Sequence, residues 1–237
     1  MLNDNDLSVI AIQRNPLRHS DNSNLHLYYD KTFEGLPVMV DKGPFIREYL
    51  SDLKHTIDLA LAEYPRIFAF RVDLRLPRYI DLPDYVDTNQ VISRFFESFT
   101  NKIQYDRERA RAQSRYARGC KVRYVWSRED SEGGKQHYHL LILLNRDAYF
   151  RLGRLVSERT NMINRIEQSW AGALRLSAGQ VSGLVHIPKN AVYRVNREVR
   201  RDEVDNLGTL FRRASYLCKT ATKSYGYRRR GFDTSRG

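Results

Sequence analysis

Cysteine and long apolar runs are scarce in this sequence. Its 237 residues include two cysteines, Cys120 and Cys218, so nothing indicates the disulfide framework of small secreted proteins. No apolar run approaches the roughly 20 residues that a membrane-spanning helix needs. The first residues also lack the charged start and apolar core of a secretory signal. We therefore expect a protein of the reducing cytoplasm with no membrane partner.

Glycine-rich loops that bind nucleotide phosphates are also missing. Neither the G-x-x-x-x-G-K-[ST] pattern nor the G-x-G-x-x-G pattern occurs in the sequence. Internal repeats and low-complexity blocks are absent as well. ATP-dependent and NAD-dependent functions therefore have no support.

Acidic residues are outnumbered by basic ones. The chain has 40 Lys and Arg against 28 Asp and Glu, which gives a net charge of +12 and a pI near 9.8. This balance favours a polyanionic partner, of which nucleic acid is the commonest. Fifteen Tyr and ten Phe accompany these charges and suit the stacking of unpaired bases. The alternative is a basic solvated surface around a Tyr-rich core.

The pattern along the chain predicts one domain with two flanking segments. Residues 1–42 are polar and are interpreted as a partly irregular N-terminal extension, residues 43–222 as the domain, and residues 223–237 as a basic tail. Apolar periodicity predicts helices over 43–64, 91–117, 157–174 and 203–220. The tail is interpreted as a nucleic-acid-binding arm because it combines arginine with tyrosine, at Arg228, Arg229, Arg230, Tyr225 and Tyr227.

A strand with alternating apolar and polar residues is predicted over RIFAFRVDLRLP, residues 66–77. Arg71 and Arg75 flank Asp73 on its polar face, which we expect to be open to solvent. The two arginines either hold DNA phosphates or neutralise Asp73, and the sequence leaves both interpretations open.

The stretch from Arg123 to Asn145 predicts a hairpin that carries a metal site. Two strands flank a Gly-Gly turn, and the second begins His137-Tyr138-His139 before five apolar residues. Residues two apart on a strand point to the same face, so both imidazoles project together, and the turn returns Glu129 close to them. Two imidazoles and a carboxylate would form an open divalent-metal site. The alternative is a solvated histidine pair that binds no metal.

A Tyr-x-x-Lys pair lies in the last predicted helix. Tyr216 and Lys219 are three residues apart and would share one helical face. Taken alone, the pair is as readily explained by a tyrosine ring packed on the core and a solvated lysine.

The order of these features resembles that of the HUH-type replication initiators, the single-strand endonucleases of rolling-circle phages, plasmids and small viruses. An apolar strand is followed by the Glu and His-x-His hairpin and then by Tyr-x-x-Lys. Within this group the chain most resembles the YagK/YfjJ C-terminal-domain proteins, related to inovirus (filamentous phage) replication proteins. The similarity extends from about Asn24 through VWSRE and HYHLLILLN to SYLCKTATK.

The resemblance implies an α/β (α+β) fold: a central antiparallel sheet of ferredoxin or RRM type, with helices beneath it and the histidines on its open face. It also implies that His137, His139 and Glu129 bind Mg²⁺ or Mn²⁺, with Asp73 or His186 as alternatives to Glu129. Tyr216 would be the nucleophile and Lys219 its helper, and Tyr225 or Tyr227 a possible second nucleophile.

The activity that the resemblance implies is nicking and joining of single-stranded DNA at a single-stranded or hairpin origin, through a 5′-phosphotyrosine. Such a protein would start rolling-circle replication of a phage or integrated mobile element, with a host helicase and polymerase as partners. Two alternatives stay open. One is a DNA- or RNA-binding regulator that no longer cuts, and the other is a metal-dependent phosphoesterase that uses water.

Overall fold

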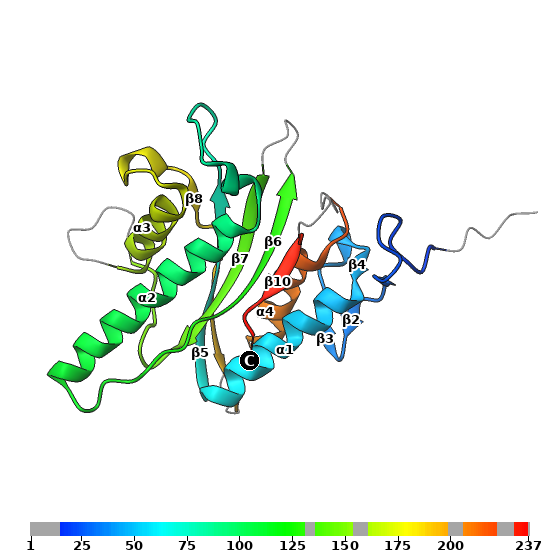
Figure 1. The fold of residues 1–237 in the computed structure, drawn as a ribbon. Helices are drawn as coiled ribbons and strands as arrows, with labels where there is room; N and C mark the ends of the chain where they lie inside the picture. Colours follow the sequence, from blue (N-terminus) through cyan, green and yellow to red (C-terminus); the bar gives the residue numbers. More distant parts are fainter. Residues whose placement is uncertain (1–14, 131–135, 154–160, 199–205, 222–229, 237) are drawn as a thin grey trace, which may run out of the picture.

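The computed structural model describes residues 15–130, 136–153, 161–198, 206–221 and 230–236, and all structural statements concern these residues. Four α-helices and four short 3-10 helices accompany ten strands in this part of the chain (Figure 1). In chain order the elements are β1 (Leu27–Tyr28), β2 (Thr32–Phe33), β3 (Leu36–Pro37), η1 (Val40–Lys42), β4 (Phe45–Ile46), α1 (Arg47–Glu63), β5 (Arg66–Arg75), η2 (Asp84–Asp87), α2 (Gln90–Gln113), β6 (Arg123–Asp130), β7 (Gln136–Asn145), α3 (Met162–Leu174), η3 (Gly179–Val181), β8 (Val185–His186), β9 (Val192–Asn196), α4 (Leu207–Ala214), η4 (Ser215–Cys218) and β10 (Phe232–Thr234).

The centre of the molecule is an antiparallel sheet in the order β10-β6-β7-β5, with β8 and β9 both paired to the outer edge of β5. Strand β7 is central because its run Leu140–Leu144 is apolar on both faces, which suits a strand covered from both sides. The predicted α+β class, with a central antiparallel sheet and flanking helices, is confirmed.

Helices cover both faces of the sheet (Figure 1). Helices α2 and α3 pack on the face that carries Phe68, Phe70 and Val72. Helix α1, with α4 and η4, packs on the opposite face, next to Ile67 and Ala69. The expectation of an open sheet face was therefore wrong: strand β5 is buried from its second to its ninth residue, because α1 and α4 complete a second core there.

The last predicted helix, over residues 203–220, consists of an α-helix followed by a 3-10 turn. Helix α4 ends at Ala214, and the 3-10 turn η4 continues to Cys218, where a single α-helix over 203–220 was expected. Residues three apart are eclipsed in a 3-10 turn, so Tyr216 and the following Lys219 still project together. Residues 203–205 lie outside the described part of the chain. Helix α2 is also shorter than expected and ends at Gln113 rather than at residue 117.

Residues near both ends of the described chain pack against the rest of the domain. Phe33, Val38 and Met39, which precede residue 42, are buried in the core on the α1 side of the sheet. Strand β10 pairs with β6, and buried Phe232 stacks on Tyr49 with ring centroids 4.2 Å apart. Residues 232–234 are therefore part of the sheet.

Among the described residues, no helix combines the length and the apolarity required to cross a membrane.

Candidate metal and tyrosine site

The candidate site lies at the end of the sheet where β5 and β6 finish and β7 begins. Cross-strand pairing places His137 opposite Glu129 on β6 and opposite Arg75 on β5, and places His139 opposite Asp73. All five side chains therefore lie at one end of one sheet face, the face covered elsewhere by α1 and α4.

Glu129, His137 and His139 form a group that can hold a metal ion. Each offers one ligand atom, and these three atoms lie within 4.8 Å of one another. Glu129 Oε2 is 3.4 Å from His139 Nε2 and 3.9 Å from His137 Nε2. A mixed nitrogen and oxygen set of this kind suits Mn²⁺, Mg²⁺ or another divalent ion, and leaves coordination positions for water or substrate.

One atom of this group fits a metal ligand particularly well. His139 is 7% exposed, and its Nε2 is buried without a hydrogen bond to any residue that the structure describes. Its polar neighbour Glu129 Oε2 is 3.4 Å away, a long contact, and a metal ion bound by both atoms would satisfy them better. The residues present therefore fit a divalent ion.

Asp73 contacts the imidazoles from the other side. Its Oδ1 lies 2.6 Å from His139 Nδ1, and its Oδ2 lies 3.2 Å from Nδ1 of His186, which is half-exposed on β8. A carboxylate on the far nitrogen fixes the orientation of a metal-binding imidazole. Of the three candidates for the third ligand, the structure thus groups Glu129 with the two histidines, and places Asp73 and His186 behind His139.

The charges of the site are arranged for cation binding. Burial raises the pKa of Glu129, but the adjacent His139 and then Lys219 lower it more, to about 2. Burial likewise raises the pKa of Asp73, and the hydrogen bond and charge of His139 outweigh this effect and lower it. Burial, with the charge of His139, lowers the pKa of His137. Burial lowers the pKa of His139, but Asp73 and Glu129 raise it more, so a metal ion would have to displace a proton from this imidazole. Two ionised carboxylates and the easily neutral His137 are already in the forms that bind a metal.

Tyr216 and Lys219 reach this group from η4. The Lys219 ammonium donates a hydrogen bond of 2.7 Å to the Tyr216 hydroxyl and lies 2.9 Å from Glu129 Oε2. The Tyr216 ring packs edge-on against His139, with centroids 5.2 Å apart. The predicted catalytic pair and the predicted metal ligands therefore form one cluster.

Arg71 occupies a place that the sequence pattern did not reveal. It was expected on an open face in contact with DNA, but it is 6% exposed, with its guanidinium carbon 5.1 Å from the Tyr216 ring centroid and its NH2 3.7 Å from Asp73 Oδ1. The covering layer of α1, α4 and η4 buries it. Its position beneath Tyr216 makes it a support of that ring.

A pocket of about 300 Å³ opens beside the histidines. It is lined by Asp73, Arg75, Leu76, Arg78, Gln136, His137 and His139. Arg75 was predicted to bind DNA and stands at the exposed end of β5. Arg78 and Gln136 were missed, because a loop residue and the first residue of a strand follow no periodic pattern.

The other predicted DNA-binding residues lie elsewhere. Arg230 is exposed and pairs with Asp233 at 3.1 Å on β10. Arg228 and Arg229 fall outside the described residues, as do Tyr225 and Tyr227.

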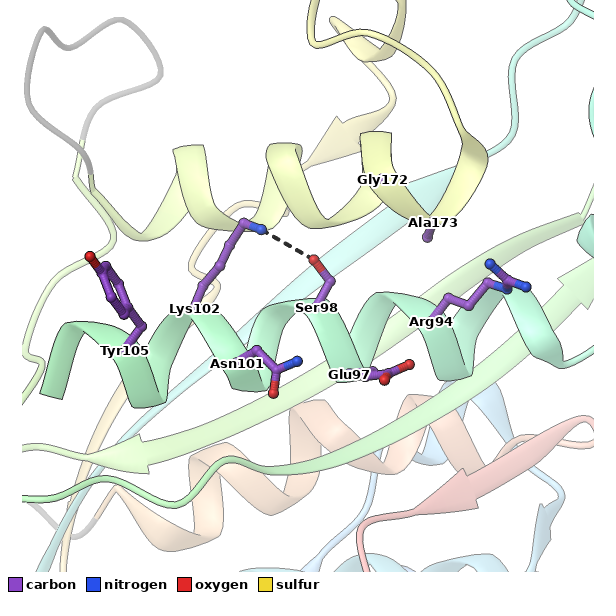
Figure 2. A pocket seen from close by; sticks show the side chains of 8 residues that line it. All are labelled: Arg94, Glu97, Ser98, Asn101, Lys102, Tyr105, Gly172 and Ala173. Atoms are coloured by element: carbon purple, nitrogen blue, oxygen red, sulfur yellow. Dashed lines mark hydrogen bonds between the residues drawn. The ribbon is translucent and has the colours of Figure 1, made fainter. Parts of the chain in front are cut away.

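A larger hollow, of about 540 Å³, lies away from this site between α2 and α3 (Figure 2). Its lining includes Arg94, Lys102 and Tyr105, and Lys102 donates a hydrogen bond of 3.2 Å to Ser98 across one turn of α2. The residues that line it include no histidine or cysteine and a single carboxylate, that of Glu97. Size alone therefore does not mark it as the reactive site.

Most of the chain matches one protein family. The family model of the YagK/YfjJ C-terminal domain matches residues 28–235. The chain belongs to this family. Uncharacterized protein YagK of Escherichia coli (strain K12) is 34% identical over 210 residues, which cover 86% of this chain and 98% of YagK. Uncharacterized protein YfjJ of the same organism is 32% identical over 204 residues, which cover 82% of this chain and 97% of YfjJ. No solved structure matches the chain.

The YagK/YfjJ domain match contains the whole candidate site, from Arg71 to Lys219. It begins at the second residue of β1 and includes β10, the last strand that the structure describes. The family match thus spans residues 28–235, whereas the domain expected from the sequence spans 43–222.

Proposed function

We propose that this YagK/YfjJ-family protein is a metal-dependent, HUH-type endonuclease that nicks and rejoins single-stranded DNA through Tyr216. The biological role that we propose is initiation of rolling-circle replication of a phage or an integrated mobile element. One observation carries the proposal: Lys219 contacts both the Tyr216 hydroxyl and Glu129, and so connects a nucleophile to a group able to bind metal.

The cluster suits attack on a phosphodiester. A divalent ion bound by His137, His139 and Glu129 would supply charge to neutralise a nonbridging phosphate oxygen and to polarise the phosphorus. A phenol has an ordinary pKa near 10, so it is a weak nucleophile at neutral pH. The hydrogen bond that Lys219 donates to Tyr216 stabilises negative charge on the phenolic oxygen as it develops.

The reaction can be written with every atom accounted for. Tyr216 Oη bonds to phosphorus while its proton passes to solvent, and the bond from phosphorus to the 3′ oxygen breaks. The 3′ oxygen takes up a proton and leaves as a hydroxyl, and the DNA keeps a 5′-phosphotyrosine. Attack by a 3′-hydroxyl reverses these steps and reseals the strand without ATP, because the tyrosine ester retains the phosphodiester energy.

The surroundings of Tyr216 support this role over that of a core residue. The ring is held between His139 and Arg71, so its position relative to the metal ligands is fixed. A tyrosine that only filled space would not need its hydroxyl placed on a buried lysine that also pairs with Glu129. The basic net charge of +12 suits a DNA substrate.

The decisive experiment looks for a covalent bond between protein and DNA. The protein is incubated with labelled single-stranded DNA from its own replicon and Mn²⁺ or Mg²⁺, denatured, and assayed for retained label. Label should be retained by the wild type and by Tyr105→Phe, a control in an exposed tyrosine on α2. Tyr216→Phe and the double variant His137→Ala/His139→Ala should lose it.

Other outcomes would replace the proposal. Cleavage without retained label that persists in Tyr216→Phe would identify a phosphoesterase that uses water. DNA binding without cleavage on every candidate origin would identify a regulator.

A further inference from the structure

The loop that follows β5, residues 76–83, lies at the rim of the candidate site. In Figure 1 it is the teal segment that rises past the end of the sheet where β6 finishes and β7 begins. Its base is fixed, because the Arg75 amide donates to Leu184 O and the Arg75 carbonyl accepts from Trp170 Nε1, both at 2.9 Å. Leu76 and Leu82 pack against the core at its two ends. The loop residues between Leu76 and Leu82 therefore extend from two fixed ends.

Tyr79 stands at the tip of this loop with its ring in solvent. It is 95% exposed, and it makes no ring, cation–π or hydrogen-bond contact with any residue in the described part of the chain. The other strongly exposed tyrosines differ. The Tyr105 ring has Arg109 over it at 5.9 Å, and the Tyr116 ring has Arg115 over it at 4.8 Å. Tyr79 thus offers a free aromatic face, and every nucleobase has a face that can stack on it.

The groups between Tyr79 and the metal ligands suit a DNA backbone. Arg75 and Arg78 are exposed and line the pocket beside His137. Two guanidinium groups offer charged donors to phosphates.

We propose that Arg75, Arg78 and Tyr79 bind the nucleotides next to the scissile phosphate of single-stranded DNA, with Arg75 and Arg78 on the backbone and Tyr79 stacked on a base. This assignment deepens the proposed function and rests on it, since it names the surface by which the metal and tyrosine site receives its substrate. Stacking discriminates weakly among bases, so the contact supplies affinity and position more than sequence preference.

The test measures binding without turnover. Tyr216→Phe protein is titrated in Mg²⁺ against a fluorescein-labelled single-stranded oligonucleotide of mixed sequence, and anisotropy is recorded. Adding Tyr79→Ala should weaken binding about 5- to 150-fold, which corresponds to about 1–3 kcal/mol for one stacked base. Tyr79→Phe should retain the affinity, because the ring remains. The control Tyr105→Ala should leave the affinity unchanged.

A second variant tests the backbone contact. Arg78→Ala should reduce the slope of log K against log salt concentration by about 0.7, the value for one phosphate of a single strand. Arg109→Ala on α2 serves as its control and should leave the slope unchanged. Equal affinities for the Tyr79→Ala and Tyr105→Ala proteins, or equal slopes for the two arginine variants, would overturn the assignment.

The two proposals fail separately. The titration requires no covalent chemistry, so a Tyr79-dependent affinity would stand even if the wild type formed no adduct. An adduct formed by wild-type protein, together with an unchanged affinity in Tyr79→Ala, would leave the chemistry intact and remove the loop from the substrate-binding surface.

Discussion

Replacement of Lys219 by methionine tests whether the nucleophile and the metal group are coupled. Lys219 is 7% exposed, and its ammonium bridges the Tyr216 hydroxyl at 2.7 Å and Glu129 Oε2 at 2.9 Å. The variant keeps most of the side-chain volume but leaves the carboxylate with His139 as its main positive neighbour. We expect Lys219→Met to lose stability as well as activity.

The size of the loss follows from the pKa of Glu129. The pKa falls from an ordinary value of 4.5 to about 2, which corresponds to about 3 kcal/mol of stabilisation from all its partners. His139 contributes more than Lys219, so removal of the lysine alone should cost about 1–2 kcal/mol at pH 7 in the absence of metal. This is less than the cost of a buried charge left with no partner at all.

The sign of the pH dependence is fixed by the same shift. A carboxyl whose pKa is depressed by folding stabilises the protein above its unfolded pKa, and this stabilisation is lost as the pH falls toward the folded pKa. Both proteins share the unfolded pKa, so the difference between wild type and Lys219→Met should be full above about pH 4 and should shrink as the pH falls through the folded pKa of Glu129, which is about 2 in the wild type.

The assay is urea unfolding of metal-free protein at pH 7 and at about pH 2.5, close to the folded pKa of Glu129, followed by tryptophan fluorescence. Both tryptophans, Trp126 and Trp170, are buried and report on the core. Lys102→Met is the matched control, because Lys102 forms a hydrogen bond to Ser98 but no ion pair within the described residues. A loss that is equal at the two pH values, or equal in the two variants, would refute the coupling of Lys219 to Glu129.

Three further predictions concern other parts of the molecule. Asp73→Asn should weaken Mn²⁺ binding about 10- to 100-fold in a calorimetric titration, because the residue orients His139, and an unchanged affinity would remove it from that role. Asp106→Asn should lower stability by about 1–2 kcal/mol at pH 7. Burial raises the pKa of Asp106, but hydrogen bonds from Tyr149 and Arg107 lower it more. The stabilisation from this ionised carboxylate is lost as the pH falls, so the urea midpoints of variant and wild type should converge below about pH 4. Phe232→Ala should cost about 3 kcal/mol in the same assay, and a neutral effect would mean that β10 is not packed on the sheet.

The grouping of the candidate metal ligands was predictable because their geometry is local. Glu129, His137 and His139 belong to two strands joined by a short turn, and the period of two residues decides which side chains share a face. The apolar run after His139 identified β7 as a buried strand. A sequence pattern is reliable where one hairpin sets the distances.

The rest of the site depends on contacts between distant parts of the chain. Arg71 was placed on an open face because strand alternation does not reveal what covers each face, and here α1 and η4 do. Strands β9 and β10 were missed because they are short edge strands with polar residues. Tyr79 was missed because loop residues follow no periodic pattern. The role proposed for it depends on the position of its loop beside the candidate site.

The site is assembled from chain segments that are completed at different times during synthesis. The hairpin of β6 and β7 supplies all three candidate metal ligands, whereas Tyr216 and Lys219 follow only after α3, β8 and β9. A polypeptide interrupted after β9 would contain the ligands for an ion and lack the nucleophile. Under the proposed function, such an unfinished product is unable to form a covalent bond with DNA, so strand cutting begins only when most of the polypeptide has been made.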